Sequence, residues 1–211
     1  MSILSELQKN KGTISSALGK SLAEKVLKGD KSILSEAVKL IKFDDKNVRA
    51  GAAKIIEQVA QNKPELVADC LKDLLLGLES SEPQTRWMII HTFGFCAKLN
   101  PVMASKALDK AEEFLNTNSG ACLWDRTILY LGYIGAVSEI HAKKVFPLLE
   151  KSLSTIPSQT KTTLESFERM FSRLDDKMKK QLLKYADKYS ISSKSSVSAK
   201  AKKIIKKLKK I

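Results

Sequence analysis

The sequence predicts an all-α protein, a right-handed α-solenoid of about five to six stacked helix pairs. Three observations predict it: a helix-rich composition, a series of short helical segments, and a motif that recurs along the chain. Among 211 residues there are only nine Gly and five Pro, and 43% are hydrophobic, which is enough for a substantial buried core. The period-two alternation of strands is almost absent, so we expect helices throughout.

Helical segments follow one another with short breaks, marked by apolar periodicity and by the residues at their ends. Pro64, Pro83 and Pro101 each stand where a first helical turn begins, a position at which the missing amide of proline costs little. Asn62, Asn100 and either Ser81 or Glu82 precede these prolines as capping residues. The clearest helices are expected over 31–43, 45–61, 64–78, 83–99, 101–116, 121–137, 139–153, 158–173, 175–189 and 196–211.

Two stretches of nine residues match each other with apolar residues in the same places: Val-Arg-Ala-Gly-Ala-Ala-Lys-Ile-Ile at 48–56 and Val-Ser-Ala-Lys-Ala-Lys-Lys-Ile-Ile at 197–205. Further copies lie between them, so the copies follow one another at 34 to 40 residues. Regular spacing combined with helix pairs indicates a solenoid. Copies begin at Val48, Thr85, Asp125, Thr160 and Val197, and a weaker one begins at Ile14.

The second position of this motif is basic in four copies, although a cation in the first turn of a helix is disfavoured by the helix dipole. A repeated cation there predicts a compensating carboxylate in its own or the neighbouring turn. We therefore expect a structural ladder that joins the repeats. Its basic residues are Arg49, Arg86, Arg126 and Lys161, and its acidic residues are Asp44, Asp45, Glu82 and Asp125.

A short turn with Asp, then Val-Arg, Ala-Ala and an aliphatic pair, as in residues 44–56, resembles the HEAT-repeat signature at the start of a second helix. The resemblance covers roughly residues 30 to 211. It implies helix pairs in two layers, with the second helices lining a concave surface that usually binds proteins. We expect one domain over 1–211, with cap helices at 3–9 and 14–28 within residues 1–30, core repeats over 31–190, and a Ser-rich turn and basic helix over 191–211.

Composition excludes several classes of protein. Cys70, Cys96 and Cys122 are odd in number and lack metal-ligand or redox spacing, so we expect small buried hydrophobes and a reducing compartment, cytoplasmic or nuclear. No signal segment and no membrane-spanning apolar run is present, which predicts a soluble, non-secreted protein. With only His91 and His141, and no phosphate loop or nucleophile elbow, we expect no enzyme, no metal, no cofactor and no small-molecule substrate.

Two of the second helices, 85–97 and 122–135, are apolar on nearly every side and hold both Trp residues. Such a helix is either fully buried or presents an exposed apolar stripe. Ile89, Phe93 and Cys96 follow the core positions of the repeat. Our functional hypothesis is an apolar groove for a partner helix or peptide, with burial in the core as the alternative. The groove residues would be Trp87, His91 and Phe95 on the first helix and Trp124, Ile128 and Leu131 on the second.

The net charge of +14 lies almost entirely at one end. Residues 1–176 hold 24 basic and 22 acidic residues, whereas residues 177–211 hold 13 basic and one acidic residue. The last helix has an apolar stripe in register with the repeats, so it can close the final repeat. Alternatively, the Ser-rich segment at 190–198 is a flexible linker that releases the helix, which then binds acidic lipid, a partner helix or phosphate. The lysines proposed for such polyanion binding are Lys200, Lys202, Lys203, Lys206, Lys207, Lys209 and Lys210.

These features favour an interaction scaffold that binds a protein segment. The alternative is nucleic-acid binding through the basic end, and binding to a membrane surface ranks below both. A narrower alternative is that the chain is similar to the HEAT-fold alkyl-purine DNA glycosylases, in which Trp, Asp and Arg line a DNA-facing cleft. Trp87 and the run Trp124-Asp125-Arg126 suit that similarity. The expected ladder already accounts for the arginine, however, and a shared fold does not imply a shared function.

Overall fold

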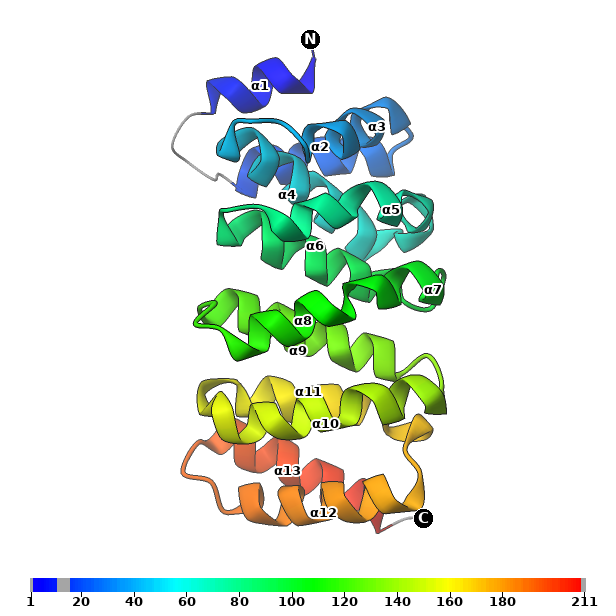
Figure 1. Cartoon of the computed structure of the whole chain (residues 1–211), viewed down its shortest axis with the longest axis vertical. Coiled ribbons are helices and arrows are strands. Elements are labelled where there is room, and N and C mark those ends of the chain that lie inside the picture. The colour runs from blue at the N-terminus through cyan, green and yellow to red at the C-terminus, as the bar shows by residue number, and fades with distance from the viewer. Residues whose placement is uncertain (1, 11–15, 210–211) are drawn as a thin grey trace. The chain divides into compact units, whose positions relative to one another are not determined.

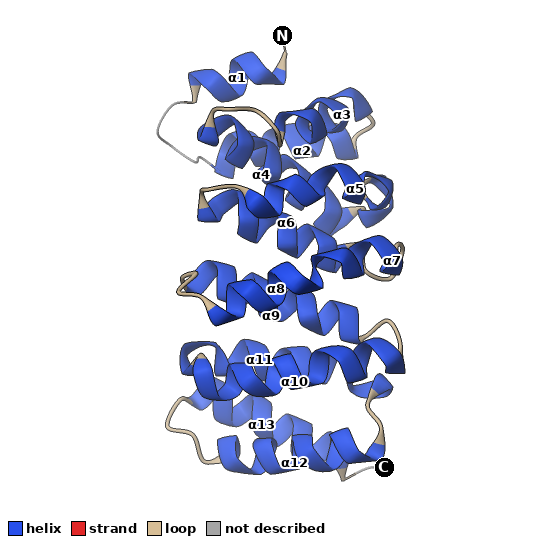
Figure 2. Ribbon diagram, viewed as in Figure 1, coloured by secondary structure: helices blue, strands red, loops and turns tan. Residues whose placement is uncertain are grey.

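The computed structural model describes residues 2–10 and 16–209, and within these ranges every regular element is a helix and no strand occurs (Figures 1 and 2). The weak motif copy expected at Ile14 and the candidate Lys210 lie outside the described residues. The chain forms two compact units, Met1–Ala111 and Glu112–Ile211. The expected all-α architecture is confirmed.

Unit 1 consists of paired helices in two layers (Figure 1). The second helices α2, α4 and α6 pack side by side, while α3 packs against α4 and the 3-10 segment η3 packs against α6. The helices are α1 (Ile3–Lys9), α2 (Ser16–Leu27), α3 (Lys31–Leu40), α4 (Lys46–Asn62), α5 (Leu71–Leu74), α6 (Pro83–Phe95) and α7 (Pro101–Ala104), with 3-10 turns η1 (Pro64–Leu66), η2 (Ala68–Cys70), η3 (Leu75–Glu79) and η4 (Ser105–Ala107).

Capping residues set where several of these helices begin. The Asp45 carboxylate accepts hydrogen bonds from the first-turn amides of α4, and the Asn100 side chain accepts one from the amide of Met103 in α7. The Glu36 carboxylate of α3 accepts from the amides of Ile3 and Leu4, so a neighbouring helix caps α1. Each cap satisfies amides that have no partner inside their own helix.

The first-layer segment 64–79 is not the continuous helix that its pattern predicts. It divides into η1, η2, α5 and η3, and at Gly77 in η3 it approaches its neighbours closely. A Cβ at Gly77 would lie 2.9 Å from Ile89 Cγ1 and 3.1 Å from Ile41 Cγ2. The segment expected over 101–116 is likewise interrupted by η4.

Unit 2 repeats the two-layer arrangement (Figure 1). The second helices α9, α11 and α13 form one layer, with α10 packed on α9 and α11 and α12 packed on α13. Helix α8 begins in the last residues of unit 1 and ends in unit 2. The elements are α8 (Leu108–Asn116), α9 (Ala121–Gly135), α10 (Glu139–Thr155), α11 (Thr160–Arg169), α12 (Asp176–Ser190) and α13 (Ser195–Leu208), with 3-10 turns η5 (Pro157–Gln159) and η6 (Phe171–Arg173).

The basic helix α13 belongs to the stack. Its apolar stripe, Val197, Ala201 and Ile204, is buried, and the helix packs against both α12 and α11. Ser198 Oγ on α13 donates to the carbonyl of Ser190 at the end of α12. The apolar stripe therefore closes the last helix pair, as the repeat register predicts.

Candidate partner-binding surface

A buried charged cluster joins the second helices α4 and α6 of unit 1. Glu57 lies at its centre and is 3% exposed. Its Oε1 lies 2.9 Å from His91 Nδ1, and its Oε2 accepts a hydrogen bond of 2.9 Å from Lys54 Nζ. Burial alone would raise the pKa of Glu57, but the hydrogen bonds from His91 and Lys54 outweigh it and lower that pKa. A buried carboxylate with two such partners fixes the side chains around it.

Two aromatic side chains of α6 border this cluster and are half-buried, Trp87 and Phe95. The Lys54 ammonium lies 5.9 Å from the centroid of the Trp87 ring, within the range of a cation–π interaction. The ring of Phe95 lies 4.1 Å, centroid to centroid, from that of His91. Trp87 and Phe95 are therefore partly exposed, and the side chains that they contact, Lys54 and His91, are bonded to Glu57.

The predicted groove residue His91 is placed differently from Trp87 and Phe95. It is only 6% exposed and its Nδ1 faces Glu57, so it belongs to the buried cluster and not to a surface for a partner. Helical spacing put the three residues in one row, but Glu57 on α4 gives the middle residue a buried polar partner. The prediction of a binding role for His91 is corrected accordingly.

The groove residues predicted in unit 2 are mostly core. Ile128 and Leu131 are both 0% exposed, so the prediction that they face a partner is wrong. Trp124 is half-buried, and its Nε1 donates to the carbonyls of Phe114 and Thr117, both at 3.1 Å. The indole of Trp124 thereby stabilises the turn between α8 and α9. Because this helix is apolar on nearly every side, the sequence pattern cannot show which side faces solvent.

One rung of the expected ladder is a two-point ion pair between repeats. Arg49 Nε and Nη2 donate to the two carboxylate oxygens of Glu82 at 2.9 and 2.6 Å, and Nη1 donates to the carbonyls of Phe43 and Asp44. Burial would raise the pKa of Glu82, but the hydrogen bonds from Arg49 and Thr85 lower it to about 2. The cation in the first turn of α4 thus meets its carboxylate in the turn before α6.

The other ladder residues make different contacts. Arg126 lies beside its own neighbour Asp125 at 3.4 Å, and Lys161 lies 3.7 Å from Glu165 one turn on. Asp125 instead reaches the next repeat by accepting a hydrogen bond of 2.8 Å from Thr162 Oγ1. The contacts of Arg126 and Lys161 with carboxylates are therefore local, unlike the two-point ion pair that joins Arg49 to Glu82 in the next repeat.

The remaining three ladder residues lie in unit 1, and Asp44 among them is exposed. Asp45 caps α4, and the Arg86 side chain on α6 is half-buried.

The lysines of α13 divide into two groups. Lys200 Nζ lies 3.0 Å from Glu168 and 3.6 Å from Glu165, and Lys203 Nζ lies 2.8 Å from Glu168. Burial would raise the pKa of Glu168, but these lysines outweigh it and lower that pKa. Lys207 lies over the ring of Phe171. Three further exposed lysines of α13 form no ion pair with a described carboxylate: Lys202, Lys206 and Lys209.

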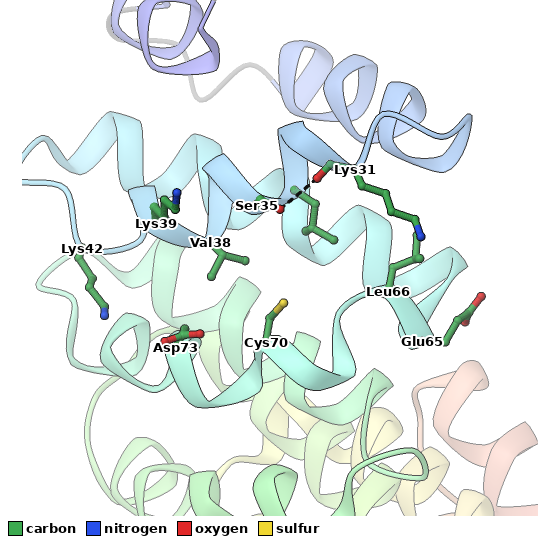
Figure 3. A pocket seen from close by; sticks show the side chains of 10 residues that line it. Lys31, Ser35, Val38, Lys39, Lys42, Glu65, Leu66, Cys70 and Asp73 are labelled. Carbon is green, nitrogen blue, oxygen red and sulfur yellow. Dashed lines mark hydrogen bonds between the residues drawn. The ribbon is translucent and has the colours of Figure 1, made fainter.

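A cleft of about 580 Å³ opens on the first layer of unit 1, between α3 and the segment from η1 to α5 (Figure 3). Its floor includes Leu34, Val38 and Leu66, and lysines line its α3 side while Glu65 and Asp73 line the other. Cys70 points into it (Figure 3). Those lysines are Lys31, Lys39 and Lys42.

The thiols are not set up as nucleophiles. Burial raises the pKa of Cys70, and the nearby Asp73 and Asp69 raise it further. Burial also raises the pKa of Cys96 to about 12, and its Sγ lies 3.6 Å from the carbonyl of Pro64. Both thiols stay protonated near neutral pH, where a nucleophile would need to be ionised. Cys122 is exposed, contrary to the expected burial of all three.

Within the described residues, no three His, Cys, Asp or Glu side chains are grouped so as to hold a metal ion. None of the described helices is both long and apolar enough to cross a membrane.

The repeat pattern does not predict a role for Glu57 or Lys54. A glutamate in a run of Ala and Ile is the one available signal, because a buried acid needs a partner, and His91 follows 34 residues later, about one repeat along. The two helix-layer units define the class of the protein as an α-solenoid.

Comparison with known proteins agrees with that class. No protein-family model and no curated protein matches this chain. A designed armadillo repeat protein in complex with the peptide (KR)4 superposes with a TM-score of 0.71 at 15% identity, over 99% of this chain and 100% of that one. An engineered protein superposes with a TM-score of 0.69 at 17% identity, over 100% of this chain and 98% of that one. At such identities the likeness establishes the fold alone.

Proposed function

We propose that this chain is a non-catalytic interaction scaffold, and that the second helices of unit 1 bind an extended segment of a partner protein around Trp87. One observation carries the proposal: a half-buried Trp on α6 next to a lysine of α4 that is itself fixed by a buried carboxylate. Trp residues are enriched among the side chains that dominate binding energy at interfaces. The designed protein of the same fold that holds a (KR)4 peptide supports a peptide as the kind of partner.

The buried cluster makes this surface rigid before a partner arrives. Glu57 holds Lys54 on one side and His91 on the other, and these two side chains contact Trp87 and Phe95 respectively. Because their positions are fixed in advance, little conformational entropy is lost when a segment binds. The cluster therefore supports binding by holding Trp87 and Phe95 in position, without contacting the partner itself.

A non-catalytic role is supported by the chemistry of the titratable groups. His91 and Glu57 are bonded to each other inside the protein, and the thiols of Cys70 and Cys96 have raised pKa values. In unit 2, Trp124 and Asp125 are engaged in contacts with Phe114, Thr117 and Thr162, which disfavours the glycosylase alternative.

We further propose that the repeats are of the HEAT type and that the protein works in the cytoplasm. HEAT repeats have two helices, as in the pairs α3–α4, α10–α11 and α12–α13. The free thiols support a reducing compartment.

Selection of a random 12-residue peptide library on the full chain tests the binding proposal. Affinities of the selected peptides are then measured for the parent, for Trp87→Ala, and for Val102→Ala on α7 as a control that removes an exposed apolar side chain from the first layer. We expect Trp87→Ala to weaken binding by at least about tenfold and Val102→Ala to leave it unchanged. Circular dichroism confirms that both variants fold.

Peptides that bind Trp87→Ala as tightly as the parent would place the site elsewhere. A library that yields no peptide above background would remove the proposal of a peptide scaffold.

A further inference from the structure

The last helix pair carries the strongest charge of the chain. Residues 177–211 hold 13 lysines and one acidic residue, Asp187, and no arginine. They form α12 and α13, which pack against each other as one helical hairpin (Figure 1). The charge is therefore displayed on an ordered surface.

Two rows of lysines on this hairpin face solvent. Along α12, Lys177, Lys180, Lys184 and Lys188 are exposed and follow helical spacing of three or four residues, which puts them on one face. That row is roughly 16 Å long, the length of about five base pairs. Along α13, Lys202, Lys206 and Lys209 form a second row with the same spacing. No carboxylate of the described residues forms an ion pair with any of these seven lysines.

Two other lysines of α13 form ion pairs within the protein. Lys200 and Lys203 lie on the side that faces α11, where Glu165 and Glu168 neutralise them. The fold thus uses internal carboxylates where α13 meets the stack and leaves the outer rows uncompensated. Like charges repel one another, so the rows raise the energy of the folded chain unless an external polyanion binds.

We propose that these two lysine rows bind the phosphate backbone of double-stranded nucleic acid, without reading its sequence. Lysine is a compact point charge and lacks the rigid planar fork with which arginine recognises a guanine edge. Stacking on bases is limited, because the rings of Tyr185 and Tyr189 are only partly exposed and their hydroxyls are held by Glu150 Oε1 and the carbonyl of Leu153. What remains is contact with phosphate, which positions a protein on a duplex and releases counterions.

A lipid surface fits this hairpin less well. An amphipathic helix binds a membrane by inserting its apolar face. The apolar face of α13 is buried in the protein, with Val197 4% exposed and Ala201 and Ile204 both 0% exposed. The helix would have to leave the stack before it could insert.

The test measures binding of a fluorescent duplex of about 20 base pairs, mixed in sequence, to the full chain across a salt series. One variant carries Lys202→Gln, Lys206→Gln and Lys209→Gln. Its matched control carries Lys72→Gln, Lys106→Gln and Lys144→Gln, three exposed lysines outside the hairpin. Each variant lowers the formal net charge from +14 to +11, so the two differ only in where charge is lost.

We expect the parent to bind with an affinity that falls steeply with salt, and the hairpin variant to reduce the slope of log affinity against log salt by about three, while the control keeps the parent slope. Circular dichroism and gel filtration confirm that all three proteins fold alike. Equal loss in the two variants would overturn the proposal, because binding would then follow net charge alone. Absence of binding at low salt would overturn it as well.

Two further probes distinguish the source of the negative charge. Vesicles of phosphatidylserine and phosphatidylcholine, and polyglutamate, are titrated under the same conditions. Binding of the duplex in clear preference to both supports the proposal. Tighter binding of the vesicles would assign the hairpin to a lipid surface, and tighter binding of polyglutamate would assign it to an acidic protein.

Discussion

The two units join their second helices by different chemistry. In unit 1, α4 and α6 are connected by hydrogen bonds between charged side chains: Glu57 is bonded to His91, and Arg49 donates two hydrogen bonds to Glu82. In unit 2, α9 and α11 are connected mainly by close approach, with hydrogen bonds from Ser166 and Thr162 of α11 to α9. A Cβ at Gly132 would lie 2.7 Å from Ser166 Cβ and 2.8 Å from its Cα, and Ser166 Oγ donates to the carbonyl of Ile128.

The same repeat pattern therefore allows two ways of packing neighbouring second helices. Charged pairs tolerate longer side chains at the interface but need every partner to be present. A glycine–serine contact needs no charge but leaves no room for a methyl group. The first solution depends on pH and the second on side-chain volume, so each can be broken separately.

The largest effect is expected from Glu57→Leu. Removing this carboxylate leaves Lys54 and His91 in the interior without their partner, and we expect a loss of about 4 kcal/mol in the free energy of unfolding, measured by urea denaturation. The matched control adds Lys54→Met and His91→Leu, which removes the whole cluster. It should recover most of the loss, and a triple variant as unstable as Glu57→Leu would contradict this account.

A smaller but still large effect is expected from Gly132→Ala, because the new methyl group would meet the backbone of Ser166, which has little freedom to move. We expect a destabilisation of about 3 kcal/mol. Gly51→Ala is the control in unit 1, where the added methyl would meet only the flexible end of Leu7. Its effect should stay within about 1 kcal/mol of the parent. Equal effects at the two glycines would show that close approach is not special to unit 2.

Glu82→Gln should destabilise the protein by about 2 kcal/mol at neutral pH, because it removes a charged two-point bond to Arg49. Since the folded pKa of Glu82 is lowered to about 2, below its ordinary 4.5, its contribution is present above the ordinary value and is lost as pH falls from there toward 2. The variant should therefore lose less stability on acidification than the parent. Parallel stability curves for the two proteins between neutral and acid pH would contradict this.

The smallest effect is expected from Thr162→Val in unit 2. It removes the hydrogen bond to Asp125 but preserves side-chain shape, and both residues are partly exposed. Chemical denaturation should show a loss of about 1 kcal/mol or less. A loss as large as that of Glu82→Gln would mean that polar bonds matter equally in the two units.

Much of the fold follows from the sequence, because caps and breakers act locally. Asp45, Asn100 and the prolines at helix starts put most helix ends within a few residues of those observed. The division of the first-layer segment into short helices does not follow from its apolar pattern. The close contacts of Gly77 with Ile41 and Ile89 also join residues that are distant in sequence.

The candidate site was predicted less completely. Trp87 and Phe95 are half-buried on α6 as a binding role requires, whereas Ile128 and Leu131 are core. Periodicity orients a helix only when polar residues mark its outer side, and α9 has few of them. The charged centre at Glu57 was missed because its partners come from two helices, and pairing across helices is not visible in a single periodic pattern.

Hydrogen exchange of the full chain, followed by mass spectrometry at neutral pH and at about pH 2.5, tests the contrast between the two units most directly. We expect α4 and α6 to lose protection at acid pH, because the pKa values of Glu57 and Glu82 are lowered in the folded chain and the stabilisation from their ionised forms is lost as pH falls below the ordinary 4.5. Helices α9 and α11 should keep their protection. Equal loss in α9 and α11, or unchanged protection in α4 and α6, would contradict this expectation.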